Sequence, residues 1–257
     1  MSGTKDPKIS IIIACLNAEK KIAKTIQSII NQHYSNIEII IIDGKSEDST
    51  LDVIKPFEKQ LYKIISEKDR GIGDAWNKGL ALASGEIIGI LNAGDYYDTN
   101  IFEKILNSLI NVTNPMIGYG DTTIFNNNHL NKIVAHYSSS KLALLNGFGF
   151  MHPSVFFTSS VINVIGTFDT QKRIGVDTDW LLKARFYNIP FIKIPSHTYM
   201  ESGGLSMTFP YTAMGEYLDS LIKYGIPKTY IILFFFFRFI GAIKNYFIYL
   251  LTMIKKS

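Results

Sequence analysis

The sequence of 257 residues predicts an α/β fold in which helices cover both faces of one mainly parallel sheet. Apolar runs of strand length recur in the first half, at residues 9–13, 37–42 and 86–91, with a shorter run at 62–66. Segments with helical periodicity separate these runs, as crossover helices do between parallel strands. The longer runs are apolar throughout because strands of a covered parallel sheet bury both faces.

Three helices are predicted between these strands. The first, at 19–32, has isoleucines at helical spacing on one face. They are Ile22, Ile26, Ile29 and Ile30. The second begins at 49–50, after an Asp-Gly turn, and continues to about Lys59. The third covers 75–83, where alanines and Gly79 allow the helix to pack closely on the sheet.

The second half of the chain is less regular. Its pattern predicts a helix at 101–110, a strand at 116–125 that ends in a turn at 126–128, a strand at 155–157, and a helix at 179–188. No internal repeat is visible, and the length suits one large domain with an appendage.

Composition narrows the class of protein. Hydrophobic residues make up 47% of the chain and charged residues 19%, and the mean hydropathy is +0.13, which favours a membrane-associated enzyme. The net charge of +4 is mild and the basic residues are not clustered, so we expect no nucleic acid partner. The single cysteine, Cys15, excludes an internal disulfide and a cysteine-based zinc site, and we expect it to be a small buried thiol.

The C-terminal segment changes character from Tyr230 onward, where aromatic and aliphatic residues dominate. Arg238, Lys244 and the lysines near the end of the chain fall within about a third of a helix circumference. A basic stripe on an apolar helix predicts an interfacial membrane anchor at 230–256, and a buried or oligomer-forming helix is the alternative. No secretory signal is visible, so we expect a peripheral protein on the cytoplasmic face of the plasma membrane.

Polar residues follow the predicted strands of the first half. Asn17, Asp43, Asp69 and Asp95 each lie just beyond the carboxyl end of a strand. Ligands bind at these ends in parallel α/β sheets, so the four residues predict one polar cleft.

Three segments carry a family resemblance. Residues 39–50 read IIIIDGKSEDST, residues 67–95 read EKDRGIGDAWNKGLALASGEIIGILNAGD, and residues 174–184 read IGVDTDWLLKA. In order and wording they resemble the family 2 glycosyltransferases with a GT-A fold, over roughly residues 8–205. The resemblance implies a Rossmann-like sheet and four parts of the chain. These are a disordered N-terminus (1–8), a nucleotide-sugar-binding half (9–100), an acceptor-binding half with the catalytic base (101–210) and a helical membrane-associating tail (211–257).

The resemblance assigns the nucleotide-sugar donor to the first two segments. The family's D-G-G-S or D-D-G-S reads D-G-K-S here, which implies that Asp43 binds the nucleotide base or ribose. The pattern D-R-G-I-G-D-A-W-N-K-G implies Asp69 and Asp74 at the ribose and Arg70 at the diphosphate or the uracil ring. Without the resemblance, Asp43 in Asp-Gly reads as a simple turn and Asp74 as a helix N-cap. Asn17, at the first strand's exit, completes the expected donor-binding set.

The metal-binding segment departs from the family pattern. The D-x-D element, often N-S-D-D or D-A-D-D, reads Asn92-Ala93-Gly94-Asp95 here, so Asp95 alone keeps a carboxylate. Mn²⁺ or Mg²⁺ prefers oxygen ligands, and the donor's phosphates and waters can supply most of them. The resemblance therefore implies a metal held by Asp95, with weak affinity when no donor is bound.

The remaining motifs concern the acceptor. The resemblance implies that Asp177 is the catalytic base, with Asp179 as the alternative, although Asp179 also reads as a helix N-cap. His152, in Met-His-Pro-Ser, resembles an acceptor-side element, and the Gly pair at 203–204 resembles a loop that closes over donor phosphates. His197 matches no motif and is interpreted as structural.

These residues predict an inverting, metal-dependent glycosyltransferase that uses a nucleotide-sugar, with UDP the expected nucleotide. The acceptor would be lipid-linked or a growing saccharide, in the synthesis of a bacterial surface polysaccharide such as O-antigen or capsule, and an oligomer is compatible with the sequence. The shortened motifs leave open a catalytically inactive binding subunit of a polysaccharide assembly complex. A nucleotidyltransferase is disfavoured because no Gly-rich basic loop follows the first strand.

Overall fold

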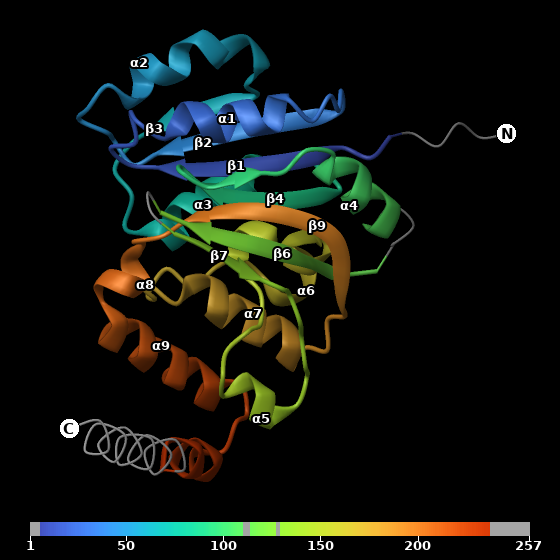
Figure 1. Cartoon of the computed structure of the whole chain (residues 1–257), viewed down its shortest axis with the longest axis vertical. Helices are drawn as coiled ribbons and strands as arrows, with labels where there is room; N and C mark the ends of the chain where they lie inside the picture. The colour runs from blue at the N-terminus through green and yellow to red at the C-terminus, as the bar shows by residue number, and fades with distance from the viewer. Residues whose placement is uncertain (1–5, 110–113, 127–128, 237–257) are drawn as a thin grey trace, which may run out of the picture.

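The computed structural model describes residues 6–109, 114–126 and 129–236. Within these ranges the strands form one sheet with a core of buried side chains on each face, which confirms the predicted α/β fold (Figure 1). Most of the predicted N-terminal segment and most of the predicted membrane anchor at 230–256, including Arg238 and Lys244, lie outside the described residues.

Four parallel strands make up the first half of the sheet. They are β1 (Ile9–Cys15), β2 (Ile37–Asp43), β3 (Lys63–Ser66) and β4 (Ile87–Asn92), in the order β3-β2-β1-β4. The register sets Asp43 between Cys15 of β1 and Ser66 of β3, and Asn92 beside Ala14 of β1. Because these strands end at the same level, the polar residues that follow them share one edge.

Helices α1 (Ile22–Ile30) and α3 (Ile72–Leu82) cover opposite faces of these strands. The predicted helix to Lys59 is instead α2 (Thr50–Ile54) followed by a 3₁₀ segment, η1 (Lys55–Gln60). Pro56 accounts for the change, because its ring lacks an N–H and cannot continue the α-helical hydrogen-bond ladder.

The second half of the sheet mixes strand directions. It contains β5 (Tyr96–Tyr97), β6 (Ile117–Phe125), β7 (Leu130–Ile133), β8 (Phe156–Thr158) and β9 (Phe191–Glu201). β8 is antiparallel to both β4 and β6, β9 is parallel to β6, and β7 pairs with β6 at its other end. The full order is β3-β2-β1-β4-β8-β6-β9-β5. The predicted parallel sheet is therefore correct for β1 to β4 and gives way to a mixed sheet beyond them.

The helices of the second half divide between the two faces. α4 (Ile101–Leu109) packs on the face that carries α1, and α6 (Ser160–Ile165) and α7 (Val176–Phe186) pack on the face that carries α3. The sequence places the start of the last helix at 179, but α7 begins at Val176 with Gly175 as its N-cap. Asp179 is therefore inside the first turn, and its prediction as an N-cap is wrong.

Three shorter segments and one long helix complete the described chain. They are α5 (Lys141–Leu144), η2 (His152–Ser154), α8 (Leu205–Thr208) and α9 (Pro210–Lys223). α9 falls in the part of the chain predicted as a tail, and it packs on α7 through a small core that includes Leu182 and Leu221. Residues 228–236 are also helical, and none of the helices described is long and apolar enough to cross a membrane.

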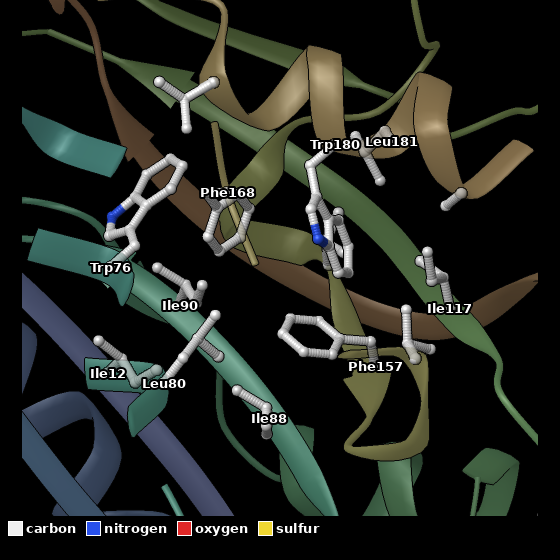
Figure 2. Packing of buried hydrophobic residues seen from close by; sticks show 14 of the residues in the cluster. Ile12, Trp76, Leu80, Ile88, Ile90, Ile117, Phe157, Phe168, Trp180 and Leu181 are labelled. Carbon is white, nitrogen blue, oxygen red and sulfur yellow. The ribbon is translucent and has the colours of Figure 1, made fainter. Parts of the chain in front are cut away.

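A row of aromatic rings joins α3 to α7 in the core on one face of the sheet (Figure 2). The ring centroids are 5.1 Å apart for Trp76 and Phe168, 5.2 Å for Phe168 and Trp180, and 4.9 Å for Trp180 and Phe157. Aromatic pairs at such separations contribute beyond their buried area. The row therefore links the predicted donor half to the helix that carries the predicted base.

The contact between α3 and the sheet permits a direct test. A Cβ added at Gly79 would lie much closer to Ile12 Cγ2 than van der Waals contact allows, and 3.1 Å from Ile12 Cγ1. We expect Gly79→Ala to lower the free energy of unfolding by about 1–3 kcal/mol, because the helix must move off β1. Urea unfolding followed by circular dichroism measures this change.

The matched control is Gly215→Ala in α9, where no atom lies within 4 Å of an added Cβ. Alanine there is expected to be neutral or to stabilise by up to about 1 kcal/mol, because glycine is a poor helix former. Equal effects at the two positions would contradict the close packing of α3 on β1.

Candidate functional site

Asp43 stands at the end of β2 and is fully buried. Its Oδ2 accepts hydrogen bonds from the backbone N–H of Ser46 (3.0 Å) and the hydroxyl of Ser66 (2.6 Å), and its Oδ1 accepts one from the Ser46 hydroxyl. Burial beside this carboxylate raises the pKa of the Cys15 thiol, so Cys15 remains a protonated buried thiol as expected. Asp43 thus organises the loop 44–49.

Asn17, which follows the end of β1, forms hydrogen bonds with the same loop 44–49. It has a positive φ of 50°, its backbone N–H donates to Ser46 Oγ (2.8 Å), and its Oδ1 accepts from the backbone N–H of Glu47 (2.9 Å). The two predicted residues Asn17 and Asp43 are therefore brought together through Ser46.

The segment before α3 gathers opposite charges. Lys78 Nζ lies 2.6 Å from Asp69, 2.9 Å from Glu67 and 3.6 Å from Asp74. Burial lowers the pKa of Lys78, but its hydrogen bonds to Asp69 and Glu67 outweigh burial and raise it overall, so the ammonium stays charged. Lys78 was not among the predicted site residues, although it lies inside the same sequence motif, four residues after Asp74.

Arg70 and Asp74 form the outer part of this cluster. Asp74 is at the third position of α3, not at its N-cap, which is Gly71 with a φ of 134°. Its carboxylate accepts from the backbone N–H of Arg70 (3.1 Å) and from Arg70 Nη2 (2.7 Å). The Arg70 side chain is 78% exposed, so most of its guanidinium faces solvent at the edge of the sheet.

Asp95 follows β4 and is only 5% exposed. Burial raises the pKa of Asp95 to about 7, against the opposing hydrogen bond from the backbone N–H of Glu201 to its Oδ1 (3.0 Å). Lys21 Nζ lies 2.7 Å from the carboxylate of Glu201. The sequence motifs did not point to Glu201, because its approach to Asp95 depends on the pairing of β9 with β5, or to Lys21, the N-cap of α1, which pairs with Glu201.

His152 stands between Asp95 and the second half of the site. Its Nε2 lies 4.0 Å from Asp95 Oδ2 and 3.3 Å from Asn92 Nδ2, and its ring packs against Trp76 with centroids 5.4 Å apart. Burial lowers the pKa of His152, and the opposing charge of Asp177 is the smaller effect. The imidazole is therefore neutral at pH 7.

Asp177 projects from the first turn of α7 into a small cavity of about 30 Å³ that His152, Trp76 and Trp180 also line. Its Oδ1 accepts from the backbone N–H (2.8 Å) and the hydroxyl (3.1 Å) of Thr178. Among the described residues no hydrogen bond reaches its Oδ2. That oxygen is available to accept a proton.

Asp179 occupies a different environment from Asp177. It is 2% exposed, and its carboxylate accepts from the hydroxyls of Ser220 (2.7 Å) and Tyr224 (3.1 Å) at the α7–α9 contact. Its two oxygens are both engaged by the protein. The structure therefore separates Asp179 from the cavity residues and gives it a clear role in holding α9.

Glu216 of α9 is a further residue that the sequence motifs did not indicate. Its carboxylate accepts hydrogen bonds from three successive backbone N–H groups, those of Arg173 (2.8 Å), Ile174 (2.9 Å) and Gly175 (2.7 Å). Burial raises the pKa of Glu216, but these hydrogen bonds outweigh it and lower the pKa overall. Glu216 thereby fixes the loop that leads to Asp177.

A second, open cavity of about 600 Å³ lies along β6 and β9 and contains none of the predicted site residues. His197 lines it and shares a hydrogen bond of 2.9 Å with Thr123, which agrees with its interpretation as structural. Within the described residues, no group of three or more His, Cys, Asp or Glu side chains is placed to hold a metal.

Solved structures that are similar to the chain share its fold. Staphylococcus aureus TarS (residues 1–349, in complex with UDP) matches with a TM-score of 0.63 and 17% identity, over 84% of this chain and 65% of that one. The mannosyltransferase PcManGT from Pyrobaculum calidifontis, in complex with GDP-Man and Mn²⁺, matches with a TM-score of 0.60 and 17% identity, over 85% and 64%. The chain spans less than two thirds of either solved chain, and these likenesses establish the GT-A fold.

Relatives found by sequence comparison are also named as glycosyltransferases. A dolichyl N-acetyl-alpha-D-glucosaminyl phosphate 3-beta-D-2,3-diacetamido-2,3-dideoxy-beta-D-glucuronosyltransferase of Methanococcus voltae is 28% identical over 96% of this chain and 80% of its own length. A PGL/p-HBAD biosynthesis glycosyltransferase of Mycobacterium bovis is 28% identical over 79% of this chain and 80% of its own. Residues 10–161 match the model of glycosyl transferase family 2, which is more than half of the chain. The protein therefore belongs to glycosyl transferase family 2.

Proposed function

We propose that the protein is an inverting glycosyltransferase that moves a sugar from a UDP-sugar to a lipid-linked or growing saccharide acceptor. The observation that carries the proposal is the placement of Asp177 in the cavity of His152, whose Nε2 is 4.0 Å from Asp95. The proposed proton acceptor and the residue proposed to lie beside the departing nucleotide are thus both close to one imidazole.

The donor would bind along the edge formed by Asp43, Asp69 and Arg70. Asp43 and Asn17 keep the loop 44–49 in place, and Arg70 presents an exposed guanidinium to a phosphate or a base. Asp69 and Asp74 remain the predicted ribose ligands, each already balanced by a cation in the protein.

The cation predicted from the sequence is Mn²⁺ or Mg²⁺, and the residues present fit it. Asp95 is buried, no described hydrogen bond reaches its Oδ2, and carboxylate oxygens are the ligands that these ions prefer. When bound, the ion would stabilise negative charge on the departing nucleotide. With few protein ligands, the donor's diphosphate and water must complete the coordination.

The reaction we propose is a single displacement. The acceptor hydroxyl attacks the anomeric carbon, the bond from that carbon to the nucleotide's phosphate oxygen breaks, and Asp177 takes the hydroxyl proton. Attack opposite the leaving group inverts the configuration. General base catalysis of this kind contributes about 10²–10⁴-fold.

A lipid-linked acceptor is supported by the name of the M. voltae relative, which refers to a dolichyl phosphate-linked sugar. It is also supported by apolar side chains that are exposed on the helical residues 228–236, where Ile232 is 66% and Leu233 is 54% exposed. We therefore propose a peripheral location at the cytoplasmic face of the membrane, with synthesis of a surface polysaccharide as the setting.

The donor is tested with a panel of UDP, GDP, dTDP and CMP, each with Mn²⁺ or with EDTA. We expect UDP with Mn²⁺ to raise the melting temperature, because a ligand present at about 100 times its dissociation constant stabilises by about 2.7 kcal/mol. Thermal shift measures binding, and slow release of UDP from UDP-sugars measures turnover. Failure of every nucleotide to stabilise the protein would favour the inactive binding subunit instead.

A further inference from the structure

Gly94 is the position in the Asn92–Asp95 segment that lacks an acid, and a carboxylate from elsewhere in the chain lies next to it. Gly94 has a φ of 111°, and a Cβ built on it would lie 2.5 Å from Glu201 Oε2 and 3.5 Å from Glu201 Cδ. From standard bond lengths, an aspartate's own oxygens lie about 2.4 Å from its Cβ. A carboxylate oxygen of Glu201 therefore lies about as far from the Cβ position of residue 94 as an oxygen of an aspartate there would lie.

The backbone fixes Glu201 relative to Asp95. Glu201 is the last residue of β9, and β9 pairs with β5 immediately after Asp95, with Tyr199 opposite Tyr96. The backbone N–H of Glu201 donates to Asp95 Oδ1 at 3.0 Å. The main chain of Glu201 is thus held against the Asp95 carboxylate at Oδ1, and none of the hydrogen bonds described is made to Asp95 Oδ2.

The charge balance at this point also favours a cation. Glu201 is paired with Lys21 at 2.7 Å, and the Lys21 side chain is 49% exposed. When Asp95 is ionised, the two carboxylates and the one ammonium leave a net charge of −1 here, which a bound divalent cation would offset. Lys21 is long and partly solvated, so it can leave Glu201 for a phosphate of the donor when another cation takes its place.

We propose that Glu201 is the second carboxylate ligand of the divalent cation, and that it replaces the acid missing at Gly94. This proposal rests on the proposed function, from which it takes nucleotide binding. It adds a second protein ligand for the cation. Protein ligands would be Asp95 and Glu201 alone, and the donor's diphosphate and water would supply the rest. Lys21 then has two roles, as counter-ion of Glu201 without cation and as a phosphate partner with it.

The test measures Mn²⁺ binding to the full chain by electron paramagnetic resonance of free Mn²⁺, with and without UDP. In Glu201→Gln we expect the affinity for Mn²⁺ in the presence of UDP to fall about tenfold or more, a loss at least as large as that for residues that only support a ligand. The affinity for UDP without metal should stay within about twofold. Glu58→Gln, an exposed acid on η1, is the matched control and should bind Mn²⁺ as the wild type does.

A second variant guards against a loss caused by misfolding. Lys21→Met removes the competing cation and keeps both carboxylates, so we expect it to bind Mn²⁺ more tightly than the wild type when UDP is absent. Wild-type Mn²⁺ affinity in a folded Glu201→Gln, together with loss of binding in Asp95→Asn, would overturn the role of Glu201 and leave the proposed function intact. Absence of Mn²⁺ binding by the wild type with UDP, GDP, dTDP and CMP alike would overturn both.

Discussion

Replacing Asp177 by Asn is expected to lower kcat by about 10²–10⁴-fold, because the amide cannot accept the proton of the attacking hydroxyl. Asn keeps the size of the side chain, so the hydrogen bonds to Thr178 and the cavity shared with His152 should change little. Binding of UDP by thermal shift should be unchanged.

Initial rates with a nucleotide-sugar and a saccharide acceptor measure the effect of Asp177→Asn. Asp219→Asn, an exposed acid on α9, is the control and should retain wild-type rates. Full activity of Asp177→Asn would show that another group takes the proton. Loss of UDP binding together with the rate would assign Asp177 to the donor rather than to the acceptor.

The second large effect is expected at Glu216, which never enters the cavity. Glu216→Ala leaves three backbone N–H groups, at residues 173–175, without their acceptor. We expect the free energy of unfolding to fall by about 1–3 kcal/mol. We also expect kcat to fall by about 10²-fold, because a base displaced by about 1 Å loses its alignment. KM for the donor should change little.

Glu216→Gln separates positioning from stability, since its single carbonyl oxygen retains part of the hydrogen bonding and should restore part of kcat. Ser220→Ala is the matched control on the same helix, because it removes one hydrogen bond to Asp179 and none to the 173–175 loop. If both variants lower kcat in proportion to stability alone, Glu216 is only a structural residue.

The parallel half of the fold could be predicted because β1, β2 and β4 are continuous apolar runs, a signal that needs no knowledge of partners. β9 escaped prediction because Lys193, Pro195 and His197 interrupt its apolar pattern, and its pairing with β6 includes a bulge. The beginning of α7 was misplaced because its N-cap is Gly175, which has no side chain to signal a cap. The loop that precedes the helix is held by Glu216, about forty residues later in the chain.

Local sequence patterns also predicted part of the site, and contacts between distant residues account for the rest. Asp43, Asp69, Asp95, His152 and Asp177 lie in motifs with local spacing, and the structure sets them along the carboxyl edge of the sheet. Roles for Glu201 and Glu216 depend on contacts between residues far apart in sequence, which no local pattern encodes. Asp179 is the opposite case. Its local sequence suggests a catalytic base, but the hydroxyls that bind its carboxylate come from Ser220 and Tyr224, far away in the sequence.

The aromatic row from Trp76 to Phe157 has a mechanical consequence. Since α3 and α7 are joined by rings that pack edge-on or tilted in the core, a hinge between the two halves would have to break those contacts. Enclosure of a bound donor then falls to short segments at the rim. Gly203 and Gly204 fit this task, because Gly203 has a φ of 96° and neither has an atom within 4 Å of an added Cβ. The two halves of the protein would then stay fixed relative to each other, and only the short segment at 203–204 would move to enclose the donor.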